Sequence, residues 1–136
     1  MRKKIAFLIL CSCVMVFLSA CSYEKESDEK VSDLEFTVLK QEEIPEELAE
    51  VIEQKKIEPF HVTYEDDALY IAVGYGEQRS GGYSIEAGEL YLTKSAICFR
   101  TKLIGPGKDE LVDDTISYPY LVVKTEKREE RVIFED

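Results

Sequence analysis

The sequence predicts an α+β fold that is mostly β: a curled antiparallel sheet or a small β-sandwich with one N-terminal amphipathic helix. Three observations lead to this prediction. With 136 residues, the chain is too short for more than one ordinary domain. Its apolar content of 45% is enough for a small core. From residue 60 onward, short apolar segments alternate with turns, and only one earlier segment has helical spacing.

The predicted helix begins at Pro45 and ends near Lys56. Proline suits the first turn of a helix, where its missing N–H is not needed. Leu48, Val51 and Ile52 follow at spacings of three and four, which places them on one face. We therefore predict one amphipathic helix of roughly three turns near the start of the domain.

The other elements are predicted to be strands. Apolar and polar residues alternate over 34–38 and 60–64, the pattern of a half-buried strand. Continuous apolar runs at Leu69–Val73 and Tyr120–Val123 predict strands covered on both faces, and we expect them to be the most buried segments. A Gly-Pro-Gly sequence at 105–107 opens a polar loop that extends to about residue 114. Further strands are predicted at Tyr83–Ile85, Leu90–Leu92, Ile97–Leu103 and Val132–Phe134, the last after a turn at Glu126–Glu129.

The first twenty residues have the layout of a secretory signal peptide. Basic residues at positions 2–4 precede a long apolar run. The run ends in Leu18-Ser19-Ala20-Cys21, which resembles the lipobox of bacterial lipoproteins, where cleavage precedes the cysteine and its thiol is acylated. That resemblance implies that residues 1–20 are a lipoprotein signal peptide. It also implies that Cys21 anchors the mature chain in the cell membrane through lipid, facing outside the cytoplasm. A retained membrane-spanning helix is the competing interpretation.

Residues 21–33 are predicted to form a lipidated flexible linker, because they are polar and charged with few large apolar residues. A single domain then occupies residues 34–136. The formal net charge of -11 argues against nucleic acid as a partner, because such binding needs clustered Lys and Arg. Only Cys98 remains as a thiol in the mature chain, so we expect no internal disulfide and favour a partly buried strand position for it.

A glycine-rich segment is the first candidate for function. Four of the seven glycines fall within nine residues, in the sequence GYGEQRSGG. Glycines cluster where the backbone takes positive φ or where another group approaches closely. Two interpretations stay open: an ordinary hairpin connection, or a shaped loop that offers Tyr75, Arg79 and Tyr83 to a protein partner.

Two segments together carry a resemblance to a known family. Residues 76–85 read GEQRSGGYSI, and after a Gly-Pro loop residues 117–124 read SYPYLVVK. A G-E-x-x-[ST]-G-G-Y segment followed by an [ST]-Y-P-Y strand resembles the PrcB family, the C-terminal domain of a protease complex subunit found in bacterial lipoproteins. The resemblance runs from Leu34 to about Lys124, with a family core at about 68–125. One departure is Arg79-Ser80, where members often have Pro-Thr or a similar pair.

The resemblance implies a non-catalytic accessory protein that binds an extracytoplasmic protease or its precursor and helps assemble or stabilise a cell-surface protease complex. The pair Tyr118 and Tyr120 has two interpretations: aromatic plugs at the rim of the core, or an exposed aromatic face beside the glycine-rich loop. The residues predicted to contact the partner are Tyr75, Gly76, Arg79, Ser80, Gly81, Gly82, Tyr83, Tyr118 and Tyr120.

An enzyme is not expected, and neither a cofactor nor a metal ion is predicted. His61 is predicted to face solvent on its strand, and no serine lies in a G-x-S-x-G setting. The paired aspartates at 66–67 and 113–114 are predicted to be turn residues. Two alternative functions remain. One is a direct protease inhibitor acting through the GGY loop, by a looser similarity to chagasin-like inhibitors that rests on Ser80, Gly82 and Tyr83. The other is a lipoprotein that binds a small ligand or an envelope polymer.

Overall fold

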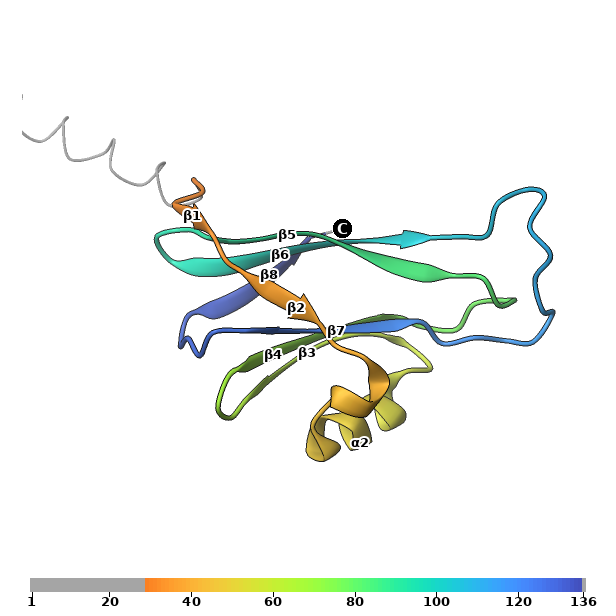
Figure 1. Ribbon diagram of the computed structural model, residues 1–136, viewed down its shortest axis with the longest axis horizontal. Coiled ribbons are helices and arrows are strands. Elements are labelled where there is room, and N and C mark those ends of the chain that lie inside the picture. The colour runs from red at the N-terminus through yellow and green to blue at the C-terminus, as the bar shows by residue number, and fades with distance from the viewer. Residues whose placement is uncertain (1–28, 136) are drawn as a thin grey trace, which may run out of the picture.

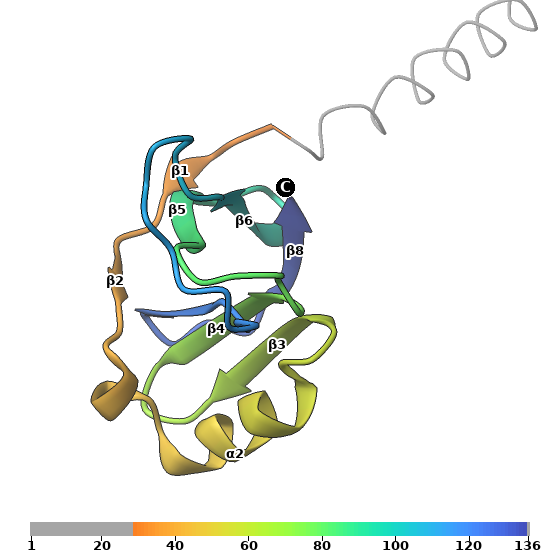
Figure 2. The same cartoon turned by 90° about the vertical axis from the view of Figure 1, so that its right-hand side faces the viewer.

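The computed structural model describes residues 29–135, which form a β-sandwich with a helix on one side. Sheet A has the strand order β1-β5-β6-β8, and sheet B has the order β2-β7-β4-β3. Figure 2 shows the layers, with helix α2 outside sheet B and sheet A on its other face. The mostly β, α+β prediction is confirmed.

The bounds of the elements are as follows. The strands are β1 (Ser32–Asp33), β2 (Phe36–Val38), β3 (Pro59–Glu65), β4 (Leu69–Tyr75), β5 (Ser84–Leu92), β6 (Ala96–Ile104), β7 (Tyr120–Thr125) and β8 (Arg131–Glu135). The helices are the 3₁₀ turn η2 (Gln41–Glu43) and α2 (Glu46–Lys55). The predicted signal peptide, the lipidation site Cys21 and residues 22–28 of the predicted linker lie outside the described residues. Between residues 29 and 135, no helix is long and apolar enough to cross a membrane.

Helix α2 agrees with the prediction from its apolar spacing. Pro45 is its N-cap residue and Lys56 its C-cap residue. Leu48 and Ile52 are each only 1% exposed, because they pack on the outer face of sheet B. The helix therefore covers one face of a sheet whose other face packs on sheet A.

Instead of one strand over 34–38, the chain over 32–38 forms two short strands in different sheets. Ser32–Asp33, placed by the prediction in the linker, pairs with β5 in sheet A, whereas Phe36–Val38 pairs with β7 in sheet B. Figure 2 shows the chain crossing between the layers at this point. Leu34 and Phe36 both contribute to the core between the sheets, so their alternation with polar residues persists across the crossing.

The core between the sheets is built mainly from β4 and β6. All of Leu69–Val73 is buried, as predicted. In the second predicted run, only Val122 and Val123 are buried, while Tyr120 and Leu121 are half-buried because β7 begins at the end of the sandwich. The other fully buried run is 96–99, which lies in an interior strand of sheet A. It includes Cys98, a free and buried thiol.

Sheet A differs from the predicted antiparallel arrangement in its last strand. β8 pairs with β6 in parallel, with Ile97 opposite Val132 and Phe99 opposite Phe134. The segment 126–130 is therefore not a hairpin turn: it connects β7 in sheet B to β8 in sheet A. The strands predicted at 83–85 and 90–92 are one strand, β5, with an irregular register between Ala87 and Leu90.

Candidate partner-binding surface

The two segments that carry the family resemblance are hydrogen-bonded to each other. The Gln78 amide donates to the Ser117 carbonyl at 2.8 Å, and the Ser117 amide donates back to the Gln78 carbonyl at 3.1 Å. The Ser117 hydroxyl donates to the Ser80 carbonyl at 2.6 Å. The Tyr75 amide donates to the Pro119 carbonyl at 3.3 Å. Segments about 40 residues apart in the chain are therefore held together as one unit.

This unit lies at one end of the sandwich, where two connections cross between the sheets. Residues 76–83 run from β4 in sheet B to β5 in sheet A, so they are not a hairpin connection. Residues 105–119 run from β6 in sheet A back to β7 in sheet B. Figure 1 shows both connections at the end away from the β7–β8 connection. We call these two connections together the GGY surface.

Two of the clustered glycines have a backbone conformation that favours glycine. Gly76 has φ of 78° and Gly82 has φ of 85°, both in the left-handed region. A Cβ on Gly82 would also lie 2.6 Å from Cγ1 of Val112. Gly81 has neither constraint, and its amide donates to the Asp113 carbonyl at 2.9 Å. Of the adjacent residues Gly81 and Gly82, Gly82 is therefore the one with positive φ.

Tyr75 is not an exposed contact residue. Its side chain is half-buried, packs against the core between the sheets, and shares a hydrogen bond of 2.7 Å between its hydroxyl and Oγ1 of Thr101. Thr101 is only 3% exposed and belongs to β6. Tyr75 therefore connects the two sheets beneath the GGY surface and supports it from inside.

Arg79 is the predicted contact residue that is most available to a partner. Its side chain is exposed, and no hydrogen bond or ion pair joins it to another residue in the range 29–135. Ser80 next to it is half-buried, and its hydroxyl donates to the Gly81 carbonyl at 3.0 Å. The Ser80 side chain is thus bonded to the backbone of its own loop. Tyr83 is half-buried with its ring beside the backbone of Gly105.

The two tyrosines of the second segment have different surroundings. Tyr120 is half-buried and packs against the cluster beneath helix α2, as expected for an aromatic plug at the rim of the core. Tyr118 is half-buried next to the bonded Ser117, and the Lys56 ammonium lies 5.4 Å from the centre of its ring. That distance is within the range of a cation–π contact. Tyr118 therefore links the GGY surface to the end of α2.

The part that residues 105–116 play in this surface was not predicted from the sequence. Asp113 organises the middle of this connection, because the Thr115 hydroxyl and amide both donate to its Oδ1, at 2.7 and 3.0 Å. These two bonds lower the pKa of Asp113 below its ordinary value of 3.8. In the sequence, an aspartate two residues before a threonine indicates a turn. This pattern does not indicate which other loop the turn contacts.

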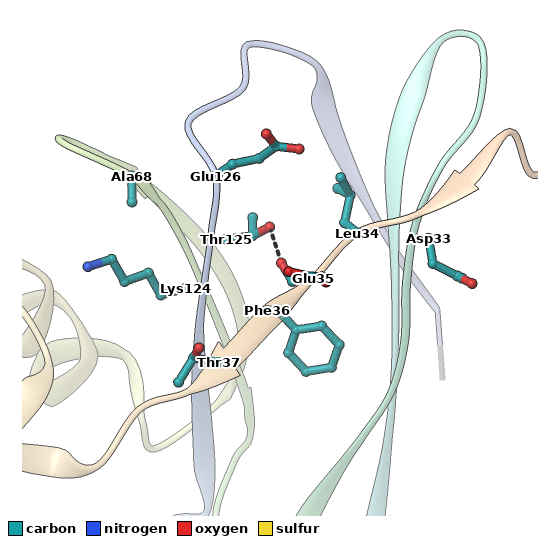
Figure 3. A pocket seen from close by; sticks show the side chains of 9 residues that line it. All are labelled: Asp33, Leu34, Glu35, Phe36, Thr37, Ala68, Lys124, Thr125 and Glu126. Carbon is teal, nitrogen blue, oxygen red and sulfur yellow. Dashed lines mark hydrogen bonds between the residues drawn. The ribbon is translucent and has the colours of Figure 1, made fainter.

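A separate groove of about 1020 Å³ lies where the chain crosses from β1 to β2 (Figure 3). The Thr125 hydroxyl donates to the Glu35 carbonyl at 2.7 Å within it. None of the predicted contact residues lies in its lining. The lining residues are Asp33, Leu34, Glu35, Phe36, Thr37, Ala68, Lys124, Thr125 and Glu126.

Metal-binding side chains and the histidine are the remaining candidates for a chemical site. Across residues 29–135, no three His, Cys, Asp or Glu side chains gather in a way that could hold a metal ion. His61 is exposed, and its ring stacks on Phe134 with centroids 4.1 Å apart. This contact joins β3 of sheet B to β8 of sheet A, and it gives the single histidine a packing role.

Comparison with known proteins gives one match. Residues 69–126 match the family model described as PrcB C-terminal. The searches of curated proteins and of solved structures found no match. The matched range begins with β4 and ends one residue after β7, so it contains both connections of the GGY surface. Over residues 69–126, the chain belongs to the PrcB C-terminal family.

Proposed function

We propose that this protein is a non-catalytic, membrane-anchored extracytoplasmic lipoprotein that binds a protease and helps to assemble or stabilise a cell-surface protease complex. The family match and the lipobox at Cys21 support the class of protein and its location. The bonding between the two family segments supports the place of contact. We assign the partner contact to the GGY surface.

The pair of backbone hydrogen bonds between Gln78 and Ser117 is the main support for this assignment. It joins the two connections into one braced surface, from which the exposed Arg79 side chain extends into solvent. A braced loop loses little conformational entropy when a partner binds. Arginine is also among the residues that contribute most to binding in protein interfaces. Both properties favour a protein partner over a purely structural connection.

The geometry favours an accessory subunit over a direct inhibitor. An inhibitory wedge needs a loop that extends away from its own domain. Here the Ser80 carbonyl accepts a bond from Ser117, the Gly81 amide bonds to Asp113, and Tyr83 is half-buried. The segment of the GGY loop that would form the wedge is therefore held against residues 105–119. The ligand-binding alternative relies on a tyrosine-lined hollow, whereas the groove at β1–β2 has no tyrosine in its lining.

The test is capture of the partner from the protein's own membranes. The full chain, with a C-terminal affinity tag, is isolated from detergent-solubilised membranes, and the eluate is treated with covalent probes that label protease active sites. We expect a labelled protease with the wild-type chain and a clear loss of it with Arg79→Ala. Arg131→Ala is the matched control, because Arg131 is also exposed and begins β8 at the other end of the sandwich.

Equal capture by both arginine variants would place the contact elsewhere, and the absence of any labelled protease would contradict the proposed function. A second measurement separates the two remaining roles. Deleting the chain should lower the amount of active protease at the cell surface if the chain is an accessory subunit. A rise in protease activity after deletion would instead indicate an inhibitor.

A further inference from the structure

The connection of residues 105–119 presents one apolar side chain entirely to solvent. This connection is fifteen residues long, counted from the end of β6 at 104 to the start of β7 at 120, and contains no helix or strand. Connections of this length without a helix or strand are uncommon in small domains. Leu111 in its middle is 100% exposed, and Ile116 is 49% exposed. Both side chains are available to bury apolar area against a partner.

The residues on both sides of Leu111 hold it outward. Val112 is half-buried, and its Cγ1 occupies the space that a Cβ on Gly82 would need. Before Leu111, the Glu110 carboxylate accepts a bond from the Gly107 amide at 3.1 Å. After Val112, the Asp113 carbonyl accepts a bond from the Gly81 amide. Leu111 therefore lies on a short segment that is fixed at both ends, which reduces the entropy lost on binding.

The surroundings of Leu111 are acidic. The connection contains Asp109, Glu110, Asp113 and Asp114, all exposed, against the single cation Lys108, so its formal charge is -3. A second copy of this chain, with a net charge of -11, would be repelled by such a loop, and so would an anionic membrane surface. A basic protein surface would be attracted to it.

We propose that Leu111 is the apolar anchor of the partner contact and inserts into an apolar hollow that is bordered by Lys or Arg side chains on the partner protein. This inference rests on the proposed function, and it names the chemistry of the partner's docking site. The acidic residues around Leu111 guide the approach, and the leucine contributes the buried apolar area. Arg79 makes a separate polar contact from the neighbouring connection.

The first experiment places a photo-crosslinking amino acid at position 111 of the full-length chain in its own cells. Position 133 is the control, because Ile133 is 37% exposed on β8. We expect an adduct with a second protein from position 111 and not from position 133.

The Asp109→Asn, Asp114→Asn double variant should lower the yield of this adduct. Neither aspartate has a hydrogen bond within residues 29–135, so the loop should keep its shape. Glu42→Gln with Glu50→Gln makes the same change in net charge on exposed residues of η2 and α2.

The second experiment measures the affinity for the crosslinked protein. Leu111→Ala should weaken binding by about tenfold or more, because the variant loses most of the apolar side-chain area that the leucine would bury in the partner. Val31→Ala is the control: Val31 is 61% exposed beside β1, and we expect no change in affinity. The melting temperature should be unchanged in both variants, because both side chains lie in solvent.

The outcomes separate this inference from the proposed function. An adduct with a protein that protease probes label supports both. An adduct with a different protein that depends on Asp109 and Asp114 supports the docking surface and contradicts the protease as partner. An adduct with a second copy of the chain, an adduct that persists unchanged in the charge variant, or no adduct at position 111 overturns the inference. Capture of a protease that depends on Arg79 would then leave the proposed function standing.

Discussion

At the scale of single residues, the clustered glycines have different roles. A Cβ on Gly74 would lie 2.1 Å from Cε1 of Phe60, so Gly74 allows that ring to lie across the neighbouring strand. Gly82 provides both a positive φ and space for Val112. Gly81 is under neither constraint. The glycine-rich composition predicted that the segment would need glycine for positive φ or for close approach of another group. The backbone angles and neighbouring atoms show which glycines meet these needs.

Gly82→Ala should destabilise the protein by about 1 kcal/mol or more, because alanine is strained at positive φ and its Cβ would overlap Val112. Gly81→Ala is the control. The atom nearest to its Cβ would be 3.7 Å away, so the change should stay within about 0.5 kcal/mol. Urea unfolding of both variants measures the difference. Equal free energies of unfolding would show that the loop does not need its present shape.

Tyr75→Phe should cost about 1–3 kcal/mol, because it leaves Oγ1 of the buried Thr101 without the partner that it has in the wild-type chain. Tyr83→Phe should be close to neutral, because the Tyr83 hydroxyl has no hydrogen bond to any of residues 29–135. Thermal unfolding monitored by circular dichroism compares the two variants. A neutral Tyr75→Phe would mean that the bond to Thr101 does not stabilise the packing of the sheets.

At the scale of elements, the connection of residues 105–119 has a bonded turn that depends on pH. Thr115 donates two bonds to the Asp113 carboxylate, and these lower the pKa of Asp113. A lowered pKa means that the bonds contribute stability above the ordinary value of 3.8 and lose it as the pH falls through the lowered value. Above pH 5 the turn should be fully formed.

Thr115→Val should raise the pKa of Asp113 toward its ordinary value, because the Thr115 hydroxyl makes the larger contribution to the shift. The measurement is a titration of the Asp113 carboxyl carbon by NMR between about pH 2 and 6, a range that spans ordinary aspartate values. The remaining bond from the Thr115 amide should keep part of the shift. An identical titration in both chains would contradict the assigned cause.

The elements also show which parts of a fold follow from local sequence. Helix α2 was predicted within one residue at each end, because its apolar spacing and Pro45 act within the helix itself. The segment 32–38 was predicted as a linker end and one strand, although it forms β1 and β2. Alternation determines which side chains are buried. It does not determine which distant strand each residue pairs with, here β5 for Ser32 and β7 for Phe36.

The same limit holds for the candidate site: local sequence indicates which segments belong to it but not how they contact each other. The two family segments were predicted from their residues, but their contact through Gln78 and Ser117 depends on two crossings between sheets. Tyr75 was predicted to be a partner contact, because tyrosine is favoured at the centre of interfaces. It is the last residue of β4, where alternation directs its side chain to the core. Leu111 lies within the predicted polar loop, but the loop's sequence does not show that neighbouring residues hold this leucine outward.

At the scale of the whole molecule, the described chain begins at β1, and Figure 1 shows this start away from the connection of residues 105–119. With a lipid on Cys21, the proposed GGY surface would lie far from the tether. A partner at that surface could then be bound without close approach of this acidic domain to anionic lipid.

Cys21→Ser should move the protein from the membrane fraction to the soluble fraction, because acylation needs the thiol. Cys98→Ser is the control: Cys98 is buried in β6, so this variant should remain in the membrane fraction. Fractionation of washed membranes followed by immunoblotting measures both. Retention of Cys21→Ser at the wild-type level would indicate a membrane helix within residues 1–20.

The crossing of the chain between β1 and β2 also bears on aggregation. It leaves each sheet with a very short edge strand on that side, two residues in sheet A and three in sheet B. On the other side, β3 begins with Pro59, which has no N–H to donate, and its His61 stacks on Phe134 of the other edge strand, β8. Short or obstructed edges offer few free backbone groups to a strand from another molecule. The same crossing that closes the core should therefore keep neighbouring copies from joining edge to edge when they are crowded together.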